Sequence, residues 1–154
     1  MRAAGKASAS IVPEGGGVTY DWANDTITVR LTGEMTGGLY TLTEDRMKAG
    51  FSFSLGLHRH KSHAETFHIL EGEVQFDIGG TPHIAKAGAT VHVPAGVPHA
   101  AKIANGRPAH MLMLYAPAGF EKFLAAMAEM TAADFADTPR MKAFNESFDL
   151  FMIE

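Results

Sequence analysis

Two histidines separated by one residue, His58 and His60, close the stretch of the sequence with the clearest alternation. Successive side chains of a strand point to opposite faces, so residues two apart share a face. Between positions 51 and 60 one face then carries the apolar residues Phe51, Phe53, Leu55 and Leu57, and the other carries Ser52, Ser54, Gly56, His58 and His60. Small polar residues beside two imidazoles leave open volume, as the wall of a cavity does. The two imidazoles on this wall are spaced to bind one ion.

Two further residues supply metal donors where turns bring the chain back. If the chain reverses between positions 61 and 64, Glu65 lies on the strand beside the two histidines. His99 follows a turn rich in proline and glycine at positions 94–98, which aims it at the same point. Three neutral imidazoles and one carboxylate suit a divalent transition metal: iron, manganese, nickel, cobalt, copper or zinc. The predicted metal ligands are His58, His60, Glu65 and His99.

The composition restricts which other chemistry is available. The chain of 154 residues has no cysteine and eight histidines, so disulfides, thiolate nucleophiles and zinc–thiolate sites are excluded. Its net charge is -4 with histidine neutral, which provides no basic surface for nucleic acid or an anionic membrane. Hydrophobic residues make up 46% of the chain, enough for one compact core. Neither an export signal nor a long apolar run is apparent, so we expect a cytoplasmic protein without a membrane span.

The remaining sequence supplies the elements that must position these side chains. Residues 1–17 are small, polar and rich in glycine, and we expect a flexible lead-in. Residues 18–116 alternate at period two in at least seven short segments separated by glycines, which predicts an antiparallel β-sandwich or barrel. Residues 117–154 change to helical spacing, with an apolar stripe from Phe120 to Met127, and end in a short apolar run expected to return as a strand. Thr138 before Pro139 predicts the N-cap of a second short helix.

The ligand residues and the turns around them resemble the two signature motifs of the cupin superfamily. The first motif, His-x-His followed by Glu and Gly, is matched by His58, His60, Glu65 and Gly72. The second, Gly followed by Pro-x-Gly and His, is matched by Gly88, Pro94, Gly96 and His99. The sequence differs from the two motifs at two positions. Ser52 stands where a glycine is usual, and Ile103 stands where an asparagine is usual.

The resemblance implies a fold and an activity. It implies an all-β antiparallel cupin β-barrel, a jelly roll, with one or two C-terminal helices and one bound metal ion. The chain looks like the group of small cupins likened to quercetin dioxygenase, which implies a metal-dependent dioxygenase acting on a small organic molecule. The same resemblance implies that Glu65 acts as a catalytic base if it leaves the metal. Two alternatives stay open: an isomerase or epimerase of a sugar or keto acid, and a non-enzymatic small-molecule binding module.

Side chains outside the predicted metal site have simpler interpretations. If the histidines face the barrel interior, Phe53, Leu55 and Leu57 face outward, and an apolar patch of that kind predicts a homodimer. Of the other histidines, His63 is expected at the solvent-exposed turn and His83 at the surface. His68 is expected to face away from the metal, whereas a place at the cavity mouth for His92 and a supporting role for His110 are left open.

Overall fold

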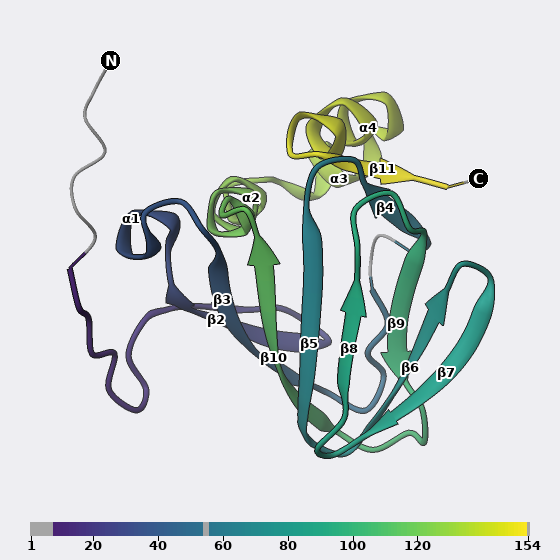
Figure 1. Cartoon of the computed structure of the whole chain (residues 1–154). Coiled ribbons are helices and arrows are strands. Elements are labelled where there is room, and N and C mark those ends of the chain that lie inside the picture. Colours follow the sequence, from purple (N-terminus) through teal and green to yellow (C-terminus); the bar gives the residue numbers. More distant parts are fainter. Residues whose placement is uncertain (1–7, 54–55, 154) are drawn as a thin grey trace.

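The fold consists of two antiparallel β-sheets that face each other, with helices at one end (Figure 1). The computed structural model describes residues 8–53 and 56–153. The first sheet has six strands, in the order β1 (Val18–Asp21), β2 (Asp25–Leu31), β3 (Thr41–Met47), β10 (Ala109–Ala116), β5 (Ala64–Glu71) and β8 (Thr90–Val93). The second has five, in the order β11 (Leu150–Met152), β4 (His58–His60), β9 (His99–Ile103), β6 (Glu73–Ile78) and β7 (Thr81–Lys86). The predicted all-β antiparallel barrel is confirmed.

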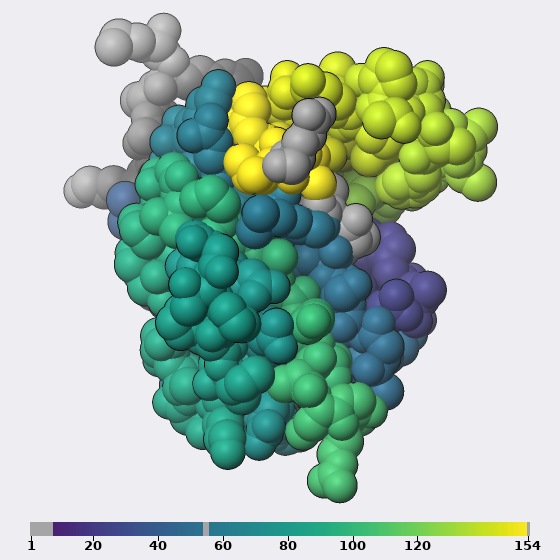
Figure 2. All heavy atoms as spheres, turned by 90° about the vertical axis from the view of Figure 1, so that its right-hand side faces the viewer, coloured from purple at the N-terminus to yellow at the C-terminus, as the bar shows by residue number. Residues whose placement is uncertain are grey.

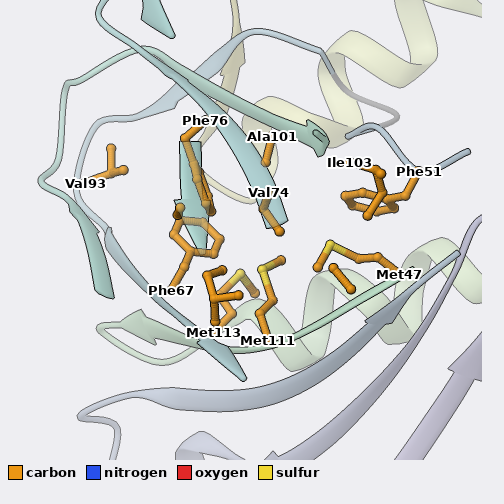
Figure 3. Packing of buried hydrophobic residues seen from close by; sticks show 13 residues of the cluster. Met47, Phe51, Phe67, Val74, Phe76, Val93, Ala101, Ile103, Met111 and Met113 are labelled. Atoms are coloured by element: carbon orange, nitrogen blue, oxygen red, sulfur yellow. The ribbon is translucent and has the colours of Figure 1, made fainter. Parts of the chain in front are cut away.

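The barrel interior is filled by side chains that alternate inward from both sheets (Figure 3). Phe67 and Ile69 of β5 and Val74 and Phe76 of β6 are each 0% exposed. Met111 of β10 fills the space between the sheets, as the period-two pattern requires of a half-buried strand. This packed interior supports the strands that carry the site.

The C-terminal segment forms a helical cap over one end of the barrel, visible in yellow above the strands in Figure 2. Helix α2 (Phe120–Ala128) buries Phe123 and Leu124 of its predicted apolar stripe, and each such burial contributes roughly 1.5–3 kcal/mol. Two more helices follow, α3 (Ala132–Ala136) and α4 (Thr138–Ser147), and one further turn, α1 (Gly33–Thr36), lies between β2 and β3. The predicted return strand is β11.

The helical segment differs from its prediction in two details. It contains three helices rather than one or two, because Thr131 and Asp134 form a capping box that starts the short α3. The predicted N-cap Thr138 is wrong: Asp137 caps α4 by accepting a hydrogen bond from the Arg140 amide, so the chain enters the helix one residue earlier.

The predicted alternation from position 51 to position 60 is also wrong, although His58 and His60 share one face of β4 as predicted. Phe51 is buried and Phe53 packs against the barrel core, whereas Ser52 is exposed. The Gly56 amide donates to the Phe53 carbonyl oxygen, and Gly56 has φ 63°, so a turn shifts the alternation by one residue before β4. The predicted positions of Ser54 and Leu55 lie outside the described residues.

This change of phase removes the argument made for a homodimer. Phe53 faces the interior, and Leu57 is half-buried at the end of the turn. Among the described residues, the outward apolar face expected from this segment is therefore absent. The homodimer stays a prediction, which sedimentation at micromolar concentration would test.

Residues 1–7 of the expected flexible lead-in lie outside the described residues. No helix in the described part of the chain has the length and apolar character needed to cross a membrane.

Candidate metal centre

The four side chains with metal-binding donors come from both sheets and meet between them. His58 and His60 lie on β4, and His99 begins the neighbouring strand β9, where it is the register partner of His58. Glu65 lies on β5 of the opposite sheet. One ligand atom from each of the four residues lies within 4.8 Å of every other. The structure therefore brings together the whole predicted set.

All four side chains are almost completely buried. His58, His60 and Glu65 are 3%, 3% and 4% exposed, and His99 is 1% exposed. Burying a carboxylate and three imidazoles away from water costs free energy unless each polar atom has a partner. The partners of these atoms therefore indicate what the cluster binds.

The three imidazoles have the same hydrogen-bonding arrangement at Nδ1. Each Nδ1–H donates to a backbone carbonyl oxygen: His58 to Gly56 at 2.9 Å, His60 to Asp149 at 2.9 Å, and His99 to Val97 at 3.1 Å. In a neutral imidazole this leaves Nε2 as an acceptor with a free lone pair. Backbone carbonyls bonded in this way orient the histidine ligands of metal sites.

The Nε2 atoms of His60 and His99 lie next to the Glu65 carboxylate. His60 Nε2 lies 3.3 Å from Glu65 Oε2 but outside hydrogen-bonding geometry, and this buried nitrogen has no hydrogen-bond partner in the described part of the chain. His99 Nε2 contacts the same Oε2 atom. An imidazole Nε2 and a carboxylate oxygen are both acceptors, so at this distance they need a proton or a metal ion between them. Three imidazole nitrogens and one carboxylate oxygen match the donors preferred by divalent transition metals, so the residues present fit such an ion.

The electrostatics of the cluster favour an ionised Glu65. Burial alone would raise the pKa of Glu65, but His60 and His99 hold it well below its usual range. Burial alone would lower the pKa of His60, but the Glu65 carboxylate and the Asp149 carbonyl raise it above its usual value. Burial lowers the pKa of His58 to about 4, so this imidazole is neutral at pH 7. A neutral imidazole and a carboxylate are the forms that bind metal.

Asp149 is a residue of this centre that the sequence did not reveal. Its carbonyl accepts from His60, and its carboxylate accepts from the amides of Lys61 and Ser62 at 3.0 and 2.8 Å. The carboxylate also pairs with His63 Nδ1 at 2.6 Å. Asp149 has φ 60°, a left-handed conformation that aspartate tolerates better than most residues. It therefore joins the C-terminal segment to the turn between β4 and β5.

His63 does not have the solvent-exposed position expected for it. Its ring stacks on Tyr115 with centroids 4.5 Å apart, and its side chain is 18% exposed. Tyr115 is buried between His63 and His60, and its hydroxyl lies 3.5 Å from His60 Nδ1. Burial and the nearby carboxylates of Glu65 and Asp149 raise the pKa of Tyr115, so the phenol stays protonated.

The other histidines lie away from the centre. His83 is at the surface, as predicted. His68 and His92 point to the outer face of their sheet, where they bond Thr90 and Thr66. His92 therefore does not line the cavity mouth. His110 bonds Glu44 at 2.8 Å, and on β5 its register partner is Glu71 rather than Glu65.

A cavity of about 310 Å³ opens onto the cluster. His58, His60 and Glu65 form part of its wall, and the remaining wall is mostly aromatic and aliphatic. This volume is at the small end of the range for ligand pockets. The arrangement is thus a buried nitrogen and oxygen donor set beside an apolar space large enough for a small organic molecule.

Part of this chain matches a known protein family and a known relative. Residues 46–115 match the family described as Cupin domain. The chain is similar to quercetin 2,3-dioxygenase of Bacillus subtilis (strain 168), with 26% identity over 97 residues, which are 63% of this chain and 28% of that protein. The chain thus spans less than a third of the length of this relative.

Solved structures share the fold at low sequence identity. KdgF from Halomonas sp. has a TM-score of 0.63 and 14% identity, covering 75% of this chain and 99% of that one. A predicted oxalate decarboxylase from Thermotoga maritima has a TM-score of 0.63 and 21% identity, covering 70% and 99%. An RmlC-like cupin from Shewanella frigidimarina NCIMB 400 has a TM-score of 0.61 and 15% identity, covering 75% and 96%. At these identities the likeness establishes a common fold.

Proposed function

Because the chain is a member of the cupin superfamily, we propose that it is a metal-dependent dioxygenase of the quercetinase type, acting on a small organic molecule. A divalent transition metal ion would be held by His58, His60, Glu65 and His99. A dioxygenase incorporates both atoms of O2 into its substrate, so the reaction needs no external reductant. When bound, the metal supplies Lewis acidity and redox chemistry to molecules in its open positions.

The observation that carries this proposal is the close grouping of three imidazoles and one carboxylate beside an apolar cavity. Each Nδ1 is already bonded to a carbonyl, so the Nε2 lone pairs are free for the metal. The cavity beside them is about 310 Å³, enough for a small organic substrate. The similarity to quercetin 2,3-dioxygenase supports the same reaction class.

The side chains around the site have separate roles in the proposed reaction. Glu65 is ionised and lines the cavity, so its carboxylate can accept the proton of an acidic substrate hydroxyl if it leaves the metal. Phe53 and Phe120 line the cavity, exclude water and position an organic substrate by contact. Tyr115 remains a protonated phenol against the His60 ring and fixes its orientation.

Oxygen consumption tests the proposal. Protein loaded separately with iron, manganese or nickel is mixed with flavonols, diketones and their amino-substituted counterparts, and oxygen uptake is recorded with an electrode. We expect uptake with at least one combination, and its loss in Glu65→Gln at saturating metal. His68→Gln, which alters an outward-facing histidine, is the matched control and retains activity.

Uptake by no combination would contradict the dioxygenase proposal. Substrate conversion without oxygen uptake would instead favour the isomerase or epimerase, in which the metal polarises a carbonyl. Binding without conversion would favour a small-molecule binding module.

A further inference from the structure

The cavity that opens onto the metal centre contains a second polar feature, two aspartates from neighbouring strands. Asp25 begins β2, and Asp45 lies on β3, where the alternating residues Thr41, Thr43, Asp45 and Met47 are buried. Met47 belongs to the barrel core, so Asp45 shares an inward-facing side of the strand. Both aspartates line the same cavity as His58, His60 and Glu65.

Asp45 is a buried carboxyl group without a partner. It is 5% exposed, and its Oδ1 atom has no hydrogen bond to any residue that the structure describes. Among the described residues, no lysine, arginine or histidine forms an ion pair with Asp25 or Asp45. The nearby Lys48 instead contacts Asp21 and the Trp22 carbonyl. A buried oxygen of this kind costs free energy unless a ligand satisfies it.

The strand register places the two polar features apart along the cavity. On β10, Asp45 is the register partner of Met111 and Glu65 is the register partner of Tyr115. Four residues of a strand span about 13 Å. Met113, midway between these two positions on β10, lines the cavity. One small molecule can thus meet the metal centre with one part and the aspartates with another.

The aromatic walls of the cavity favour an organic cation over a second metal ion at the aspartates. Trp22, Phe51, Phe123 and Phe135 line this cavity, and aromatic faces attract ammonium groups. Two carboxylates with aromatic neighbours supply too few oxygens for the six or more that hard divalent cations take. A neutral hydroxyl would satisfy Oδ1 but would bring no positive charge to the pair.

The charges of the metal centre and of the aspartate pair also favour an organic cation at the aspartates. A divalent ion with three neutral imidazoles and one carboxylate keeps one net positive charge, which suits an anionic oxygen of the substrate. Burial raises the pKa of Asp25 to about 6 and, with the help of the Asp25 charge, raises that of Asp45 well above its usual range. A bound ammonium group would favour the ionised form of both carboxyl groups, so the pair suits an organic cation.

We propose that Asp25 and Asp45 bind the ammonium group of the substrate, whose oxygen atoms face the metal centre. The substrate class is therefore a small amine that also carries an oxygen donor. The ammonium site does not rest on the proposed function, because it is built from residues separate from the metal cluster. Only the statement that the oxygen atoms of the substrate face the metal centre rests on that function.

Calorimetry with two probes of the same shape tests the ammonium site. 2-Phenylethylammonium carries the charge and 2-phenylethanol does not, and both are titrated into the full chain at pH 7 and 0.15 M salt. We expect the ammonium to bind at least tenfold more tightly than the alcohol. Asp45→Asn should reduce the preference to less than threefold. Asp77→Asn, on β6 and outside the cavity lining, is the matched control and keeps the preference.

A third variant separates this inference from the proposed function. His99→Ala removes a metal donor but no lining residue of the cavity, so the preference for ammonium should survive. Equal binding of the two probes, binding of neither, or a preference unchanged in Asp45→Asn would overturn the ammonium site. Absence of oxygen uptake with every substrate would contradict the dioxygenase and leave the calorimetric result standing.

Discussion

The Nδ1 of His60, on strand β4, lies 2.9 Å from the backbone carbonyl oxygen of Asp149, which is close to the C-terminus in sequence. The strand that follows Asp149 pairs directly with β4, and Leu150 is the register partner of His60. The orientation of a central imidazole in the metal centre therefore depends on a segment far away along the chain. The C-terminal segment is part of the site as well as a cover for the barrel.

Replacing Asp149 tests this dependence. Asp149→Ala removes the carboxylate that accepts from the amides of Lys61 and Ser62 and places alanine at φ 60°. We expect metal affinity to fall by about 10-fold to 100-fold, as when the residues that orient metal ligands are changed. Chelator competition measures the affinity. Asp149→Asn tolerates the left-handed conformation and keeps one acceptor oxygen, so it should lose much less. Equal affinities for the two variants would refute the role given to Asp149.

The two glycines of the matched motifs have different physical requirements. Gly72 has φ 82°, and a Cβ atom there would lie 2.8 Å from both the Ala109 Cβ and the Pro108 carbonyl oxygen. Gly88 has φ 89° but open space around it. Gly88→Ala should therefore cost about 1–2 kcal/mol, from the backbone conformation alone. Gly72→Ala should cost more, because Pro108 and Ala109 must also move. Urea unfolding of both variants measures the difference, and a smaller loss for Gly72→Ala would show that the close approach is unimportant.

The raised pKa of Asp25 predicts a pH-dependent stability. Its pKa is about 6 in the folded protein, because burial disfavours the charged form, and close to 4 in an unfolded chain. The folded state therefore holds a proton that the unfolded state releases, and the contribution of Asp25 to stability falls as pH rises from about 4 to about 6. Asp25→Asn lacks this penalty, so its free energy of unfolding relative to wild type should increase over the same pH range. Urea titrations at pH 4 and pH 7 compare the two proteins, and a relative decrease at pH 7 would contradict the assignment.

The donor set was predictable from sequence because each donor follows a local rule. His58 and His60 are two apart on a strand. Glu65 follows a short turn, and His99 follows a turn whose glycine and prolines restrict the backbone. The apolar stripe that begins at Phe120 was also predictable, because helical periodicity is a short-range signal.

The features that were missed depend on tertiary contacts or on single backbone angles. The left-handed Gly56 changes the strand phase, so Phe53 packs inside although simple alternation from His58 places it outside. Asp149 lies within a short apolar run, and its hydrogen bond to His60 joins residues distant in sequence. Asp45 sits in an alternating strand where a buried, unpartnered carboxyl is unusual. A polar residue at an inward position of a predicted strand was the available signal for it.

Metal content is the most direct test of the central claim, that His58, His60, Glu65 and His99 bind one metal ion through Nε2 and carboxylate atoms. Wild-type protein, His58→Ala, His99→Ala and the outward-facing control His68→Ala are loaded with metal, desalted and analysed by mass spectrometry for metal per chain. We predict about one ion per chain in wild type and His68→Ala, and a loss of most of the metal in the two variants of the centre. Full metal content in His58→Ala or His99→Ala, or no metal in wild type, would contradict the account.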